Sequence, residues 1–199
     1  MAPTMPLPIR TAGIALALAL SAPPASAQDA SACWLMRGTH AEAAERPSPL
    51  DSASTRIGGA EVKVCYGAPS VRGREIMGGL LPWGEPWRAG ANEFTSIRLA
   101  FPAEVAGVRL EPGAYGLYVI PGERSWTVVL SGQAERWGDP IDEGVRAADV
   151  GTGTVTPEAT EGMVERLAFR FEPAGQGAAD LLLEWERTRV RIPIRRMDG

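Results

Sequence analysis

Planar and polar side chains gather in one short stretch of this chain, where they would suit the binding of a small molecule. Trp83 and Trp87 are four residues apart, and two such rings can form flat apolar walls for a sugar or another ring compound. Arg88 follows directly and carries five N–H donors in a planar fork. Asn92 offers a donor and an acceptor, and Glu93 is a carboxylate. These five residues are the first candidates for a ligand site.

Two more arginines, Arg72 and Arg74, lie upstream in the same stretch. In an extended segment, residues two apart point to the same side, where these two would either clamp an anion or stay solvated. The competing interpretation of the stretch is structural. Arg88 and Glu93 would then satisfy each other as an internal ion pair, and Asn92 would bond the backbone of a tight loop. The sequence leaves both interpretations open.

Residues for familiar catalytic machinery are scarce. The single histidine, His40, falls near the N-terminus, so a Ser-His-Asp or Cys-His arrangement is not expected. The chain lacks the His and Cys clustering of zinc sites, and the Gly-Thr-Gly at 151–153 lacks the spacing and lysine of a phosphate-binding loop. The acids between 139 and 143 do not follow a calcium-loop pattern. We predict no catalytic residue, no metal site and no cofactor.

The elements that must position the candidate residues are β-strands. Apolar and polar residues alternate in several segments, which is the period of a half-buried strand. Two other segments are more continuously apolar, as in a central strand. The expected strands are 61–66, 97–101, 115–120, 126–130, 167–171, 181–185 and 190–194, the last two joined by a tight connection at Glu186-Arg187.

The candidate residues themselves fall in Gly67–Thr95, whose many glycines and prolines indicate a structured loop between strands. Short strands bounded by such residues, without a long amphipathic helix, predict an all-β fold. We expect one antiparallel β-sandwich, jelly-roll-like, over residues 51–196. A short N-terminal arm over residues 28–50 would precede it, with at most a short helix at 41–45. A chain of 199 residues suits a single domain.

The first 27 residues have the composition of a signal peptide. Arg10 precedes the short apolar run Thr11–Leu20, and Ala25-Ser26-Ala27 supplies small residues at a cleavage site. The run is too short to span a bilayer. We therefore expect an exported protein, periplasmic or secreted, with no transmembrane segment after cleavage. The alternative is a lipoprotein anchored at Cys33.

Export would place the two cysteines in an oxidising compartment, which favours a disulfide between Cys33 and Cys65. Closing that loop would stabilise the fold by roughly 3 to 4 kcal/mol in the chain-entropy model. A free, reactive Cys65 is the alternative. The net charge of −4 shows no basic excess for a nucleic-acid partner.

Three strings together resemble the signature of the bacterial exported family catalogued as domain of unknown function 2911. They are PSVRGR from Pro69, GGLLPWG from Gly78 and WRAGANEFT from Trp87, and similarity continues through PGAYGLYVIP from Pro112. The resemblance spans roughly Pro47 to Ile194. It implies an exported β-rich domain and no particular activity. Members often have arginine before the first proline, where this chain has Ala68.

Two functions follow as expectations. The first is a non-enzymatic domain of the cell envelope that binds a small polar or saccharide-like ligand, or an envelope protein. Its candidate ligand-binding residues are Arg72, Arg74, Trp83, Trp87, Arg88, Asn92 and Glu93. The alternative is a glycosidase-like hydrolase, in which Glu93 would work with a second carboxylate at a suitable separation.

Overall fold

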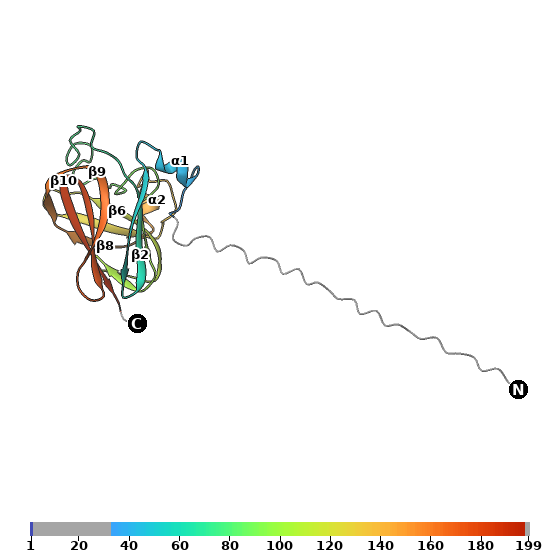
Figure 1. Ribbon diagram of the computed structural model, residues 1–199. Coiled ribbons are helices and arrows are strands. Elements are labelled where there is room, and N and C mark those ends of the chain that lie inside the picture. The colour runs from blue at the N-terminus through green and yellow to red at the C-terminus, as the bar shows by residue number, and fades with distance from the viewer. Residues whose placement is uncertain (2–32, 198–199) are drawn as a thin grey trace. The chain divides into compact units, whose positions relative to one another are not determined.

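Antiparallel strands form most of the computed structural model, which describes Met1 and residues 33–197. Apart from Met1, the predicted signal peptide and the first residues of the arm lie outside the described residues. From Cys33 onward the described chain forms one compact unit. Its strands make two sheets, one of six strands and one of four (Figure 1). The fold is therefore an all-β sandwich, as predicted, and its sheets are not closed into a barrel.

The six-stranded sheet has the order β1-β2-β3-β6-β7-β8, and every neighbouring pair in it is antiparallel. Its strands are β1 (Leu50–Ile57), β2 (Ala60–Gly67), β3 (Ser96–Leu99), β6 (Gly113–Ile120), β7 (Trp126–Ser131) and β8 (Asp149–Val155). The strands β2 and β3 lie side by side, with Val64 opposite Ile97. The long loop after Gly67 therefore leaves this sheet and returns to the neighbouring position.

The four-stranded sheet has the order β5-β4-β10-β9. Its strands are β4 (Ala103–Val105), β5 (Val108–Leu110), β9 (Pro157–Pro173) and β10 (Ala178–Arg196). The last two form a long hairpin that packs across the first sheet. Two short helices complete the described part, α1 (His40–Ala44) and α2 (Glu143–Arg146). The first corresponds to the short helix predicted at 41–45, and it begins with a capping box between Thr39 and Glu42.

The core lies between the sheets and follows the alternation of the sequence. Val62, Val64 and Tyr66 of β2 are buried, and so are the inward residues of β10. The Tyr66 hydroxyl accepts a hydrogen bond from the Phe169 N–H across the sandwich, at 3.1 Å. Burial raises the pKa of Tyr66 to about 12, because the phenolate would be desolvated there.

One strand boundary was wrong. The segments 181–185 and 190–194 were predicted as two strands joined by a tight connection, but both belong to β10, which is continuous. Register shifts interrupt its pairing with β9 on either side of Glu186, whose φ is +58°. The extra residues lie in β9, whose partners Ala168, Val164 and Ala159 are spaced more widely than Glu184, Glu186 and Thr188 of β10. Such an irregularity bends the strands without reversing β10. The polar pair at Glu186-Arg187 therefore marks a bulge.

The predicted disulfide is confirmed. Cys33 and Cys65 are bonded, with their Cα atoms 5.7 Å apart. The bond joins the N-terminal arm to β2. His40 of the arm also lies back on this junction, with its Nε2 2.8 Å from the Cys33 carbonyl oxygen.

Candidate functional site

The loop between β2 and β3 is held in place by main-chain contacts to both sheets. Trp87 exchanges two backbone hydrogen bonds with Val119 of β6, at 2.7 and 2.9 Å. Ser70 forms an isolated bridge with Arg166 of β9. The Glu186 carboxylate at the β10 bulge accepts the N–H of Ile76, at 3.3 Å. The loop is thus ordered by partners distant in sequence.

Close backbone approaches explain part of the unusual composition of this loop. The Ala91 N–H donates to the Gly67 carbonyl at 3.1 Å. A Cβ on Gly67 would lie 2.0 Å from the Ala91 oxygen, so no side chain fits there. Ala89 and Asn92 have φ values of +53° and +64°, in the left-handed region that non-glycine residues seldom adopt. The loop therefore folds back tightly on the end of β2.

A cavity of about 470 Å³ opens beside the folded-back loop, a volume within the range of small-molecule sites. Three arginines line it, Arg72, Arg74 and Arg88, together with the carboxylates of Glu85 and Asp139. Other parts of its wall come from the loop, from the N-terminal arm and from β10. They include Ser48, Ser70, Leu80, Pro82, Pro86, Trp87 and Trp185.

Two stacked tryptophans form one apolar part of the wall. The ring centroids of Trp87 and Trp185 are 5.5 Å apart and their planes meet at 22°. The Trp87 indole N–H donates to the Gly90 carbonyl at 3.2 Å. The Trp185 indole N–H is buried, and no hydrogen-bond partner for it exists among the described residues. The sequence predicts Trp87 as a site residue, whereas it places Trp185 at the end of a strand.

Arg88 lies at the boundary between protein and solvent, with its side chain 20% exposed. Its Nη1 forms an ion pair with the Asp139 carboxylate. Its Nε is buried and lacks a hydrogen-bond partner in the described part of the chain. Burial lowers the pKa of Arg88, because the charged guanidinium loses solvent there. The structural interpretation of an Arg88–Glu93 ion pair is therefore wrong.

Arg72 and Arg74 reach the cavity from the first part of the loop, and each is tied to backbone carbonyls. The Arg72 Nη2 donates to the Pro47 carbonyl at 2.9 Å. The Arg74 guanidinium donates to the carbonyls of Val71 and Ser70, at 3.0 and 2.7 Å. These bonds orient the two side chains but provide no negative charge.

Three predicted residues lie outside the cavity lining. Glu93 is 3% exposed, and its carboxylate accepts from Arg46 at 2.7 Å and from the Met36 N–H at 3.4 Å. Asn92 donates to the Ser48 carbonyl at 2.9 Å. Trp83 is 40% exposed on the outer part of the loop. Arg46 was not predicted to meet Glu93, because the two residues are 47 positions apart.

Sequence reasoning missed several cavity residues, among them Glu85, and it missed Asp139 and Trp185 for different reasons. Asp139 was considered only as a calcium ligand, since nothing in the local sequence indicates that it meets Arg88. Trp185 ends the predicted strand 181–185, whose three leucines are typical of a core strand. In both cases the signal is a contact between distant segments. Within the described range, no group of three or more His, Cys, Asp or Glu residues is arranged to hold a metal ion.

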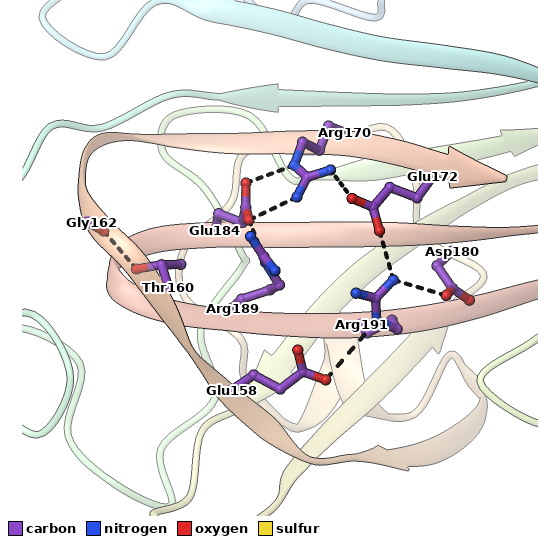
Figure 2. A network of polar contacts seen from close by, with 9 residues as sticks. All are labelled: Glu158, Thr160, Gly162, Arg170, Glu172, Asp180, Glu184, Arg189 and Arg191. Atoms are coloured by element: carbon purple, nitrogen blue, oxygen red, sulfur yellow. Dashed lines mark hydrogen bonds and ion pairs between the residues drawn. The ribbon is translucent and has the colours of Figure 1, made fainter. Parts of the chain in front are cut away.

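A network of polar contacts lies elsewhere, on the β9–β10 hairpin (Figure 2). Arg170 pairs with Glu172 and Glu184, and Arg189 also pairs with Glu184. The hydrogen bonds from Arg170 and Arg191 lower the pKa of Glu172 to about 2. Burial opposes ionisation of Glu184, but bonds from Arg170 and Arg189 outweigh it and lower its pKa. Every carboxylate of this network has an arginine partner, so we interpret the network as stabilising the hairpin and not as a ligand site.

A scan against protein-family models places residues 48–194 in the family described as "Protein of unknown function (DUF2911)". The chain belongs to this family. The matched region covers both sheets and all the loop residues of the cavity, so the cavity is built from the family domain. No curated protein and no solved structure matches the chain. Membership carries no activity with it. No helix in the described residues is long and apolar enough to cross a membrane.

Proposed function

We propose that this protein is an exported, non-enzymatic binding domain that holds a small polar or saccharide-like ligand in the cavity beside the β2–β3 loop. The observation that carries the proposal is the composition of that cavity. The residues that line the cavity include two stacked tryptophans, Trp87 and Trp185, and three arginines. Rings supply apolar faces for a ligand, and fixed polar groups orient it.

The Arg88 environment supports a binding role over a purely structural one. Arg88 is partly exposed, and its ion-pair partner Asp139 has a side chain that is 59% exposed. Arg46 is exposed to the same extent, 20%, so the two ion pairs differ in their carboxylates: Glu93 is 4% exposed, as expected for a scaffold pair, whereas Asp139 is open to solvent. Export is supported by the signal-peptide pattern and is compatible with the disulfide.

A thermal-shift screen of neutral sugars and small carboxylates tests the proposal. We expect at least one compound to raise the Tm of the wild type, because a ligand that binds only the folded state stabilises it. The shift should be lost in Arg88→Ala. Arg109→Ala, an exposed arginine on β5, is the matched control and should keep the shift. The proposal fails if no compound stabilises the wild type more than Arg88→Ala.

The hydrolase alternative stays a prediction. It rests on Glu93, whose carboxylate binds Arg46 and does not line the cavity. A glycoside panel with the wild type and Glu93→Gln is its test, and equal turnover by both would remove Glu93 from any mechanism.

A further inference from the structure

Two unpaired hydrogen-bond donors at the cavity narrow the chemistry of its ligand. Four buried side-chain polar atoms of the described residues have no hydrogen-bond partner, and two belong to cavity residues: Arg88 Nε and Trp185 Nε1. Both groups can only donate. Buried polar groups in folded proteins are nearly always paired. A ligand that satisfied both atoms would have to present acceptors.

The charge at the cavity favours the same kind of ligand. Neither Arg72 nor Arg74 takes part in an ion pair within the described chain, since their guanidinium groups contact backbone carbonyls. The arginines of the β9–β10 network behave differently, because each has a carboxylate partner (Figure 2). Three arginines and two carboxylates, Glu85 and Asp139, line the cavity, which leaves one net positive charge to attract an anion.

The remaining lining residues indicate what kind of molecule carries the negative charge of the ligand. Trp87, which is 8% exposed and stacked on the buried Trp185, and the prolines offer apolar surface to a ring. Glu85 and Asp139, in contrast, are acceptors that would be matched by hydroxyl donors. An aromatic acid would leave those two carboxylates without such donors. A hydroxylated ring that bears a carboxylate matches the apolar residues, the carboxylates and the arginines of the lining.

Resting on the proposed binding function, we infer that the ligand is a sugar acid. Its carboxylate would lie among the cavity arginines and accept the N–H of Trp185, while its hydroxyls would bond Glu85 and Asp139. Trp185 becomes a ligand-binding residue in addition to a core residue. Its indole is 1% exposed, so its donor is held in a fixed position from within the sandwich.

Calorimetric titration with D-glucuronate, D-galacturonate and their neutral counterparts D-glucose and D-galactose tests this inference on the purified protein. We expect at least one acid to bind about tenfold or more tightly than its neutral counterpart, the size of effect expected for hydrogen bonds to a charged group. Benzoate serves as the aromatic acid and should bind more weakly than that sugar acid.

A pair of tryptophan variants tests the donor assignment. Trp185→Phe keeps a packed ring but removes the N–H, and it should weaken binding of the preferred acid about tenfold. Trp126→Phe is the matched control, because the Trp126 N–H is also buried without a partner but lies outside the cavity lining. It should leave binding unchanged. If Trp185→Phe does not fold, the exposed Arg72→Gln variant replaces it and should reduce the preference for the acid.

The outcomes separate this inference from the proposed function. Equal binding of acids and neutral sugars, or binding of neutral sugars alone, would overturn the sugar-acid assignment and leave a saccharide-binding domain. Tighter binding of benzoate than of the sugar acids would contradict the inference that the ligand carries hydroxyl groups. Equal losses in both tryptophan variants would overturn the role of the Trp185 donor. If neither these compounds nor the wider screen bind, the proposed function itself is wrong.

Discussion

At the scale of single residues, the arginines of this protein differ in what neutralises them. Arg46 has the buried carboxylate of Glu93, and Arg88 has the exposed one of Asp139. Arg72 and Arg74 have backbone carbonyls. The same side-chain type is thus structural at one position and available for a ligand at another. Local sequence does not separate these cases, because the partner is supplied by a distant segment.

The Arg46–Glu93 pair gives a prediction at this scale. Arg46→Ala would leave the Glu93 carboxylate, which is almost fully enclosed, without its ion-pair partner. We expect a loss of about 2 to 4 kcal/mol in the free energy of unfolding, toward the low end for a pair with one partly exposed member. Chemical denaturation measures it. The exposed Arg109→Ala should change stability by less than about 0.5 kcal/mol, and an equally small effect of Arg46→Ala would contradict the structural role.

At the scale of elements, the β9–β10 hairpin shows how a bulge was mistaken for a turn. The residues of β10 in the main core are Ala179, Leu181, Leu183 and Trp185 before Glu186, then Val190, Ile192 and Ile194 after it. The parity changes from odd to even across Glu186. A reversal of the chain and a single residue out of alternation, such as Glu186 with its φ of +58°, both produce that change. Only the pairing with β9 on both sides distinguishes them.

The ion-pair network on this hairpin gives a pH prediction. The pKa of Glu172 is lowered from 4.5 to about 2 in the folded state by its bonds to Arg170 and Arg191. The unfolded chain therefore binds a proton first as pH falls, so stability decreases through the window from about 4.5 down to 2. We expect Glu172→Gln to reduce this decrease in Tm. Glu161→Gln, an exposed glutamate of β9 outside the network, should leave it unchanged. Equal pH slopes in the wild type and Glu172→Gln would contradict the prediction.

At the scale of the whole molecule, the N-terminal arm is part of the site. The disulfide attaches it to β2, and its carbonyls at Pro47 and Ser48 accept from Arg72 and Asn92. Ser48 also lines the cavity. The arm was predicted as a separate segment, and its residues in fact complete the wall that the loop begins.

Removing the disulfide should therefore destabilise the fold as a whole. We expect the double variant Cys33→Ser/Cys65→Ser to lose roughly 3 to 4 kcal/mol, the loop-closure entropy of a cross-link between residues 32 apart. Thermal and denaturant unfolding measure the loss. Adding a reductant should lower the Tm of the wild type and leave the double variant unaffected. An unchanged Tm in the variant would show that the arm is held by its other contacts alone.

The fold class, the family and the disulfide could be predicted from the sequence. Alternation of apolar residues indicates which face of a strand is buried, and the predicted export favoured a bond between the two cysteines. The sequence also located the loop that holds the cavity. Only the tertiary structure decided which side chains meet there: Arg88 with Asp139, Glu93 with Arg46, and Trp87 with Trp185. Alternation assigns a residue to a face but not to a partner, and the partners come from segments that the sandwich brings together.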